Sequence, residues 1–464
     1  MTVPSPIRLR WWPLPVFIAL AFLIFWPTLG FLAFSDDHSA LWNSGVRGIP
    51  WRNGFFRPLS DLTFRAVHSF CGSSPWEQRA FNVALHGANA FLLFAFFVRY
   101  VGRSSASAWP GAWLAGLLFI IYPFHQESIV WIVGRESSLG TFFVLLGLLL
   151  LNGPGPQWRR IGTSCASMFV GALCYESALL LPFLVIPLAR YGLFELPTAP
   201  RKLGFAFGAV IALYALLWLL QGHQAGGSYL GGFLEKDPMA LVASIPKVIA
   251  RLFLPPLDPV YMKVAATALF LAITVVVVVT WRSTRDERTG RSGILAMVLL
   301  LAIACVLPVV GGVSTRTSES DRFLYMPSAF LCVTLAMLIT RILQRWVHHS
   351  VVLCVVLGSI ALLRANHRNW EHASATTARI LSQLPSPPRN GRLFISGLPD
   401  SYCGAFIFRN GFREAVHLRG LDGDRYIPVI AMGRPGLVHF RDEDIVPGPD
   451  DRWLVWREEE FHER

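Results

Sequence analysis

Long apolar segments separated by short polar connections dominate this chain. Many of these segments run for roughly 18–20 residues, the length that a helix needs to cross the apolar part of a bilayer. The pattern therefore predicts an all-α polytopic membrane protein, in which several of the shorter spans are tilted or broken. About eleven spans are predicted, at residues 14–34, 80–101, 108–122, 137–151, 161–175, 177–190, 203–221, 263–281, 293–311, 323–343 and 349–364.

The pattern changes after about residue 364, where charged residues become frequent. Short strand-like segments follow a linker marked by three prolines, and Asn410-Gly411 is typical of a tight turn. We therefore expect a transmembrane domain at residues 1–370 and a small mixed α/β or β-rich module at 371–464. The linker prolines are Pro385, Pro387 and Pro388, and the expected strands lie at 393–395, 405–408 and 453–456.

The connections between the predicted spans differ in charge between the two faces of the membrane. With a cytoplasmic N-terminus, every inside connection is basic, as the positive-inside rule requires. The other face then receives the acidic and histidine-rich clusters, the C-terminal module and two long loops, at residues 35–79 and 222–262. Loops of this length usually carry structure or function of their own. Within the second loop, residues 239–254 read as an amphipathic interfacial helix.

Composition supports the membrane assignment and changes the interpretation of the charge. The 464 residues are 53% hydrophobic and 15% charged, against about 25% charged in soluble domains. The formal net charge of +12 would suit nucleic acid, but the basic residues lie in short connections, where membrane topology and anionic lipid explain them. We therefore expect no nucleic-acid partner. The preference for arginine over lysine is typical of a GC-rich bacterial genome, so we expect a multi-pass protein of the bacterial inner membrane with its active site on the periplasmic face.

Neither the cysteines nor the N-terminal segment indicates a metal site or a cleaved signal peptide. Of seven cysteines, Cys71 and Cys403 fall outside the predicted membrane, and a disulfide between them stays open. No CxxC or HExxH spacing of a metal site is present. The first apolar segment follows Arg8 and Arg10 but lacks a small-residue cleavage site, so we expect an uncleaved first helix.

An acidic pair, Asp36 and Asp37, directly follows the first predicted span. Charge in this place needs water, a partner or a function. Ser35 or Asp36 would serve as the N-cap of a short interfacial helix. Alternatively, one carboxylate is a general base that accepts the proton of an attacking hydroxyl. In an extended segment the two side chains point to different sides, so one would face the pocket and the other would orient a neighbour or bind a cation.

Further polar clusters occur at or near the ends of predicted spans. His86 and Asn89 share one face of the second span, where a buried, hydrogen-bonded histidine is the alternative to a pocket. Pro123 ends or kinks the third span and leaves irregular backbone of the kind tolerated beside a cavity. His125, Glu127 and Arg135 gather around this break as a polar pocket or as an interfacial cap.

Two more clusters carry charge on the same face. Glu176 lies in a tight turn between two apolar segments and is a pocket residue or a solvated hairpin tip. Asp321, Arg322 and Tyr325 open the tenth span, where Arg322 is suited to bind a lipid phosphate through two charge-assisted hydrogen bonds. Interfacial anchoring of the helix is the competing explanation.

The order of these motifs resembles that of multi-spanning glycosyltransferases of the GT-C fold class. It is most similar to the membrane half of the transmembrane and tetratricopeptide-repeat O-mannosyltransferases and their bacterial relatives. The resemblance covers roughly residues 14–370. The motifs that carry it are Asp36-Asp37, Arg57-Pro58, Leu85-His86 with Asn89, Pro123 to Ser128 with Gly134-Arg135, and Asp321 to Ser328.

The resemblance implies transfer of a sugar from a polyprenyl-phosphate donor to a hydroxyl on the outer face of the membrane. The first outer loop would supply the general base of an inverting displacement, and cationic groups would stabilise the departing phosphate. The implied site comprises Asp36 or Asp37 as the base, Arg322, Arg135 and Arg57 at the phosphate, and His86, Asn89, His125, Glu127, Glu176, Asp321 and Tyr325 around the sugar and acceptor.

The acceptor and two rival functions stay open. The helical repeats that would present a protein are missing, so the acceptor is a glycan, a lipid or a protein. A transporter or flippase would show related halves and charges at mid-helix, whereas the charges here lie at helix ends. A polymerase or ligase of lipid-linked glycans would use the same donor. No cofactor is required by the motifs, and the need for a divalent cation stays open.

Overall fold

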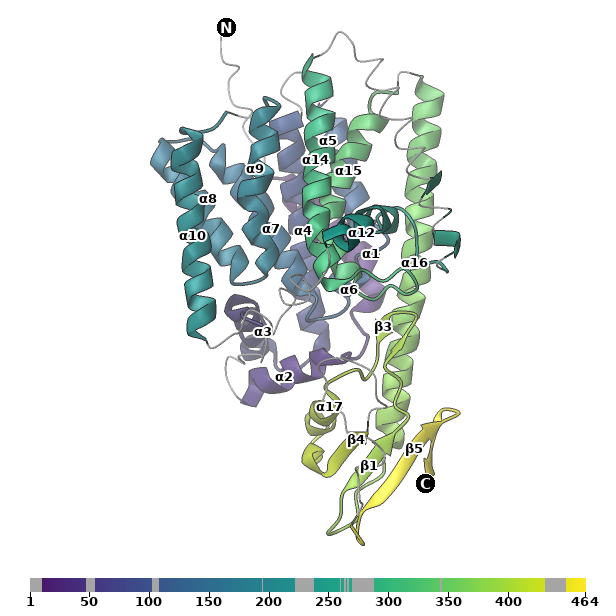
Figure 1. Ribbon diagram of the computed structural model, residues 1–464. Coiled ribbons are helices and arrows are strands. Elements are labelled where there is room, and N and C mark those ends of the chain that lie inside the picture. The colour runs from purple at the N-terminus through teal and green to yellow at the C-terminus, as the bar shows by residue number, and fades with distance from the viewer. Residues whose placement is uncertain are drawn as a thin grey trace.

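The computed structural model describes most of the chain. The described residues are 11–46, 55–101, 108–193, 195–221, 238–258, 260–262, 264, 267–268, 288–342, 344–429 and 448–464. They form a tall helical bundle with a small sheet-containing module at one end (Figure 1). The first helix starts at the end of the bundle farther from this module.

Helices make up the bundle, and several end in short 3-10 or π-helical turns. The α-helices are α1 (Pro13–Phe25), α2 (Asp36–Val46), α3 (Pro58–Cys71), α4 (Pro75–Phe96), α5 (Ala108–Ile120), α6 (Gln126–Ile129), α7 (Arg135–Leu151), α8 (Gln157–Ala172), α9 (Leu181–Arg190), α10 (Pro200–Leu220), α12 (Pro238–Arg251), α14 (Arg288–Gly311), α15 (Tyr325–Ile339) and α16 (Arg345–Gln383). The 3-10 turns η1 (Trp26–Thr28), η3 (Glu176–Leu180) and η4 (Asp321–Leu324) and the π-turn η2 (Phe97–Val101) adjoin them.

Each predicted apolar segment within the described residues coincides with a helix. The segment predicted at 263–281 lies almost wholly outside them, as does the start of the second long loop at 222–237. In the described part, four helices are long and apolar enough to cross a membrane, at 75–101, 200–220, 321–339 and 345–383. Three shorter apolar helices lie at 13–28, 109–120 and 293–307. The number eleven therefore stays a prediction.

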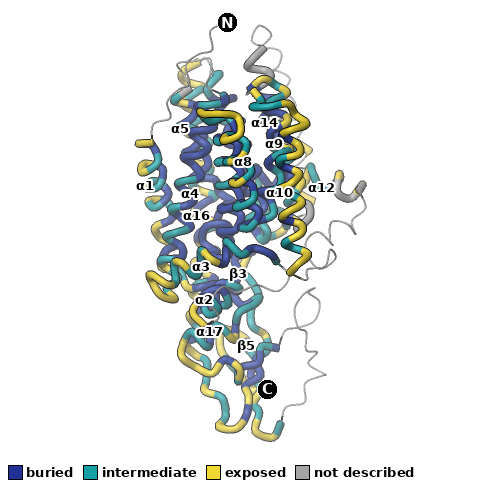
Figure 2. Tube along the Cα trace, turned by 90° about the vertical axis from the view of Figure 1, so that its left-hand side faces the viewer, coloured by how far each residue is buried: buried dark blue, intermediate teal, exposed yellow. Residues whose placement is uncertain are grey.

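Two of the four long helices, α10 and α16, have many exposed apolar residues, and the run of exposed residues along α10 is visible in Figure 2. Only 17% of the apolar window of α10 and 6% of that of α16 is buried inside the protein. Exposed side chains include Phe205 and Leu220 on α10 and Leu357 on α16. An apolar surface of this extent is unfavourable in water and stable in lipid, which indicates that these helices face the bilayer.

The centre of the bundle is formed by α4, which packs against α1, α5 and α7. Gly87 permits the contact with α1, because a Cβ at this position would lie 2.5 Å from the Cα of Ile18. Close approach of helices through small residues is typical of membrane proteins, in which dispersion contacts stabilise helix pairs. The packing holds α4 and α7 rigidly, and both helices begin at the end of the bundle that carries the acidic clusters.

The C-terminal module is a mixed α/β unit, as the sequence predicted. Its sheet has the order β4-β1-β5-β6, with β1 parallel to β4 and β5, and β6 antiparallel to β5. A separate hairpin pairs β2 with β3. The elements are β1 (Leu393–Ser396), β2 (Ser401–Tyr402), β3 (Ala405–Phe406), α17 (Phe412–Leu418), the 3-10 turn η5 (Gly423–Arg425), β4 (Tyr426–Val429), β5 (Arg452–Arg457) and β6 (Glu460–Glu463).

Three sequence expectations differ from the structure in detail. The domain boundary expected at residue 370 falls inside α16, which continues unbroken to Gln383 before the proline-rich linker. Cys71 and Cys403 are both free and exposed, so the disulfide left open between them is absent. Asp36 and Asp37 begin a helix rather than lying in an extended segment, because the first turn of a helix favours acidic side chains.

Candidate active site

The acidic pair begins α2, and its two carboxylates differ in environment. Asp37 is completely buried, whereas Asp36 is only partly buried. One oxygen of Asp37 accepts a hydrogen bond from the N–H of Phe34 at 3.1 Å, and the other accepts from the N–H of Val133 at 3.0 Å. Asp37 therefore ties the first loop to the segment between α6 and α7, and Asp36 is the more accessible carboxylate.

Burial shifts the protonation of the groups around Asp37. Loss of hydration raises the pKa of the Asp37 carboxyl to about 7, although the positive charge of Arg79 and three backbone hydrogen bonds oppose the shift. Burial likewise lowers the pKa of His38 to about 3. His38 is therefore neutral at pH 7, and the charge of Asp37 is sensitive to pH near neutrality.

Arg57 precedes α3 and forms ion pairs with two glutamates. Its guanidinium pairs with Glu136 at the start of α7 and lies 2.9 Å from Glu176 of η3. The guanidinium also lies over the rings of Phe55 and Tyr175, 4.6 and 4.5 Å from their centroids. The side chain of Glu176 is 34% exposed while that of Arg57 is 6% exposed. Arg57 thus joins α3, α7 and η3 beneath a partly solvated carboxylate.

Arg322, in η4, pairs with Glu127 of α6 and borders a pocket. Glu127 binds both the guanidinium and the backbone N–H of Arg322, the latter at 3.2 Å. Burial raises the pKa of Glu127, and the charge of Arg322 opposes this shift. The Arg322 side chain is 16% exposed, and its guanidinium lies 5.3 Å from the ring centroid of Trp131. Arg322 is therefore an oriented cation that is still accessible.

A small pocket of about 20 Å³ lies beside Arg322, which is room for little more than one water-sized group. Helices α7, α14 and α15 and the turns η3 and η4 surround it. Its lining combines one guanidinium and four hydroxyl groups with apolar side chains: Ser137, Thr141, Tyr175, Ser177, Ala304, Leu307, Arg322, Phe323, Met326 and Pro327. The lining thus places one cation among hydroxyl groups and apolar side chains, the kinds of group that an anion attached to an apolar chain would contact.

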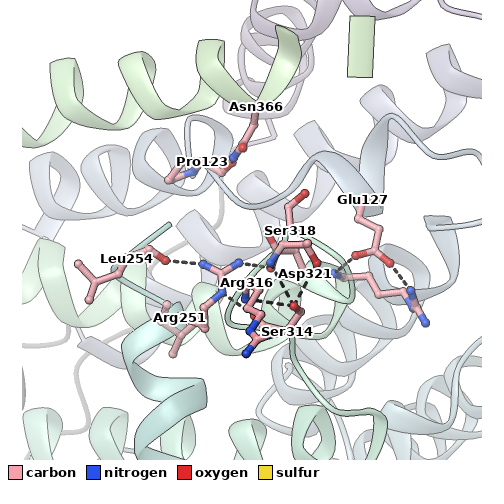
Figure 3. A network of polar contacts seen from close by, with 12 residues as sticks. Pro123, Glu127, Arg251, Leu254, Ser314, Arg316, Ser318, Asp321 and Asn366 are labelled. Atoms are coloured by element: carbon pink, nitrogen blue, oxygen red, sulfur yellow. Dashed lines mark hydrogen bonds and ion pairs between the residues drawn. The ribbon is translucent and has the colours of Figure 1, made fainter. Parts of the chain in front are cut away.

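Asp321, next to Arg322 in sequence, points to a different partner. Its carboxylate pairs with Arg251 at the end of α12, and both side chains are almost fully buried. Arg251 also donates to the carbonyl oxygens of Ser314, at 2.9 Å, and Leu254. Figure 3 shows this network with Glu127 beside it. Asp321 therefore fixes α12 to η4 instead of facing the pocket.

His86, Asn89, His125 and Tyr325 meet in the interior of the bundle. The hydroxyl of Tyr325 is 2.8 Å from Nδ1 of His86 and accepts from the amide of Asn89 at 3.1 Å. Nε2 of His125 is 2.7 Å from the hydroxyl of Ser328. Burial lowers the pKa of His125 far below its usual value. These four residues are fully buried and join helices, as in the alternative of a buried, hydrogen-bonded histidine; their role in a sugar pocket stays a prediction.

Arg135 is fully buried at the start of α7 and is held by three residues. Its guanidinium donates to the side chain of Asn82 at 2.8 Å, to the backbone and side-chain oxygens of Gln78 at 2.8 and 2.7 Å, and to Thr63 at 3.3 Å. A lipid phosphate could reach it only after these bonds were broken. The geometry therefore favours a structural role over the predicted phosphate contact.

Two buried arginines of this region were missed in the sequence. Arg79 donates to the carbonyl of Val130 at 2.8 Å and to the carbonyls of Phe31 and Leu32, and Arg251 binds Asp321. Arg79 thereby fixes the segment before Asp36 against the loop before α7. A lone arginine beside an apolar helix indicates a buried partner or a functional site. This signal was present in the sequence for both Arg79 and Arg251. Among the described residues, no group of three or more His, Cys, Asp or Glu side chains could hold a metal ion.

Comparison with known sequences finds relatives among protein O-mannosyl-transferases. The chain is 40% identical over 96 residues to protein O-mannosyl-transferase TMTC2 of Mus musculus, a match that covers 20% of this chain and 11% of the mouse protein. It is 29% identical over 189 residues to Tmtc2 of Drosophila melanogaster, covering 35% of this chain and 20% of the fly protein. The matched part thus spans a fifth or less of these relatives. No family model matches the chain.

Comparison with solved structures identifies the fold. The archaeal oligosaccharyltransferase AglB from Archaeoglobus fulgidus, solved with an inhibitory peptide and a dolichol-phosphate, superposes with a TM-score of 0.51 at 12% identity. The alignment covers 90% of this chain and 64% of the archaeal protein. The relatives found by sequence are animal proteins, so the bacterial origin inferred from arginine usage receives no support. The motif-based resemblance is confirmed: the chain is similar in sequence to the protein O-mannosyl-transferases and has the fold of GT-C membrane glycosyltransferases.

Proposed function

We propose that this protein is a membrane glycosyltransferase that moves a sugar from a polyprenyl-phosphate donor to an acceptor hydroxyl. One observation carries the proposal: the segment 131–133 lies between the acidic pair and the pocket cation. Asp37 binds the N–H of Val133, and Arg322 lies over the ring of Trp131. The neighbour of the candidate base and a candidate phosphate ligand are therefore both in contact with a single short segment at one end of the bundle.

Arg322 and its pocket supply the donor subsite. The phosphate of the donor would bind the Arg322 guanidinium, and the pocket lining also contains the buried hydroxyl of Ser177, which has no hydrogen-bond partner among the described residues. The polyprenyl chain would lie along the apolar side chains of α14 and α15, which belong to the membrane part. Glu127 holds the guanidinium in place before the donor arrives. Charge-assisted hydrogen bonds to phosphate are the strong type that such a site needs.

Asp36 is the proposed base, since it is partly accessible whereas Asp37 is buried and committed to two backbone N–H groups. The acceptor oxygen attacks the anomeric carbon, and the bond from that carbon to the phosphate oxygen breaks. Asp36 takes the hydroxyl proton, and the phosphate leaves with the bonding electron pair and is stabilised by Arg322. A single displacement inverts the anomeric centre. Because the sequence relatives are named O-mannosyl-transferases, mannose is the first sugar to test.

Donor binding by the purified protein in nanodiscs tests the phosphate subsite. With a polyprenyl-phosphate mannose probe, Arg322→Ala should weaken affinity about 10- to 100-fold, the effect of one lost hydrogen-bonded charge. Arg316→Ala is the matched control, because Arg316 is exposed and lies only six residues earlier. Equal affinity of the wild type and Arg322→Ala would remove Arg322 from the site. If the protein binds the lipid-linked sugar and releases it on the outer face without transferring the sugar, the result would favour the alternative function of a transporter or flippase.

A further inference from the structure

The C-terminal module contacts both segments that carry the proposed chemistry. Its loop 403–411, here named the clamp loop, runs from the β2–β3 hairpin to the start of α17. Toward the acidic pair, the N–H of Ser35 donates to the carbonyl of Ile407 at 2.9 Å, and the N–H of Asn410 donates to the Ser35 hydroxyl at 3.1 Å. The ring of His38 stacks on Phe408 with centroids 5.8 Å apart.

The same loop contacts the segment that leads into Arg322. The N–H and the hydroxyl of Ser318 both donate to the carbonyl of Cys403, at 3.3 and 2.9 Å. Arg409 pairs with Glu319 of this segment and with Asp400 of the module. The ring of Phe406 lies 4.9 Å from that of Trp131, the residue over which Arg322 lies. The clamp loop thus spans the distance between the base segment and the donor segment.

One residue in each of the two segments has a left-handed backbone conformation. Ser35, directly before Asp36, has φ +47°, and Ser320, two residues before Arg322, has φ +72°. Left-handed conformations are unfavourable for residues other than glycine and persist where the surroundings impose them. Serine does not prefer this region, so the two strained residues depend on the packing around them, which the clamp loop supplies on one side.

Two glycines make the close approach possible. Gly411, with φ +77°, lies so near Ser35 that a Cβ would overlap the Ser35 carbonyl oxygen. Gly404, with φ +94°, would place a Cβ 2.5 Å from the Ser318 hydroxyl and 2.6 Å from the N–H nitrogen of Glu319. Gly420 of the same module shares the φ of Gly411, but a Cβ there would meet nothing within 4 Å. Among the glycines in the described part of the chain, only Gly404 and Gly411 therefore combine a left-handed backbone with contact to a proposed site segment.

We propose that Gly404 and Gly411 are positioning residues, through which the clamp loop sets the locations of Arg322 and Asp36 relative to each other. The proposal rests on the function proposed above and assigns the C-terminal module a part in the reaction. The module then acts as a fixed wall of the site rather than as a separate appendage. Gly411 acts on the base and Gly404 acts on the donor cation, so their replacement should change different kinetic parameters.

Alanine substitutions at the three glycines form a matched test with polyprenyl-phosphate mannose as the probe. Gly411→Ala should lower kcat at least 10-fold and leave donor affinity unchanged, since only Asp36 is displaced. Gly404→Ala should weaken donor affinity at least 10-fold. Gly420→Ala has the same left-handed strain as Gly411→Ala without the overlap and should alter neither parameter. Similar kinetics for Gly411→Ala and Gly420→Ala would overturn the proposal.

Two serine variants that disturb the structure less than the glycine variants guard against misfolding. Hydrogen exchange adds a measurement that does not depend on activity. Ser35→Ala and Ser318→Ala each remove one hydroxyl contact to the clamp loop and should give smaller effects on kcat and donor affinity, respectively. Hydrogen exchange should accelerate in residues 33–46 for Gly411→Ala and in residues 314–326 for Gly404→Ala. If the wild type transfers no sugar yet exchange responds in this way, the proposed function fails and the clamp stands as a structural device. Unchanged exchange in both segments would refute the clamp itself.

Discussion

At the scale of single residues, two adjacent aspartates differ in environment because only one is fully buried. Asp37 accepts the N–H groups of Phe34 and Val133 at the start of α2, whereas Asp36 is partly exposed and is the base in our proposal. The sequence located the pair by its position behind an apolar helix. It could not separate the two roles, because the partner of Asp37 is a backbone N–H 96 residues away that no local pattern reveals.

Buried Asp37 should make folding stability depend on pH. Its folded pKa is raised from 3.8 to about 7, so the folded state retains a proton that the unfolded state releases, and stability falls as pH rises from about 4 to 7. Between pH 5 and 7 the loss is on the order of 2 kcal/mol. Thermal unfolding in detergent should show this decline in the wild type relative to Asp37→Asn, which cannot titrate. A constant difference between the two proteins across this range would contradict the raised pKa.

At the scale of elements, the length of the apolar segments predicted the helices. The hydrogen bonds and ion pairs between helices were not predictable from the sequence pattern. The long apolar segments predicted the positions of α4, α7, α10 and α15, because a helix that crosses lipid consists of a continuous run of apolar residues. Arg251 and Asp321 are 70 residues apart, and such pairs form only once α12 and η4 meet. The helices that cover His86 and Tyr325 were not predictable for the same reason: helical spacing places side chains on a face but does not say which helix covers that face.

The Arg251–Asp321 pair should contribute strongly to the attachment of α12 to η4. Asp321→Asn leaves a fully buried guanidinium without its counter-ion, and breaking such a pair costs about 3–5 kcal/mol. Arg251→Met with Asp321→Leu removes both charges and should restore most of that stability. Thermal unfolding of the single and double variants measures the coupling. Additive losses in the double variant would show that the two side chains do not interact.

At the scale of the whole molecule, the apolar surfaces of α10 and α16 face lipid, while the polar end of the bundle joins the C-terminal module. The sequence predicted a mixed α/β module and a membrane body. It could not predict their contact, which joins Ser35 to Asn410 across 375 residues. Topology remains a prediction: the positive-inside rule places the acidic end outside the cytoplasm, together with the exposed thiols of Cys71 and Cys403.

Thiol labelling tests this topology. In variants that retain one cysteine each, a membrane-impermeant maleimide added to intact cells or sealed vesicles of known orientation should modify Cys71 and Cys403 from the non-cytoplasmic side. Cys354 is also exposed but lies within the apolar window of α16, so lipid should shield it and it serves as the control. Labelling of Cys71 and Cys403 only after permeabilisation would reverse the orientation.

Asp36 is proposed to be the base of a sugar transfer from a donor bound at Arg322. The decisive measurement is single-turnover transfer from radiolabelled polyprenyl-phosphate mannose by wild type, Asp36→Asn and Asp37→Asn in nanodiscs, with donor affinity measured on the same samples. We expect Asp36→Asn to bind donor normally and to transfer about 10²–10⁴-fold more slowly, the usual contribution of a general base, while Asp37→Asn loses less. Full transfer by Asp36→Asn with normal folding would contradict the central claim.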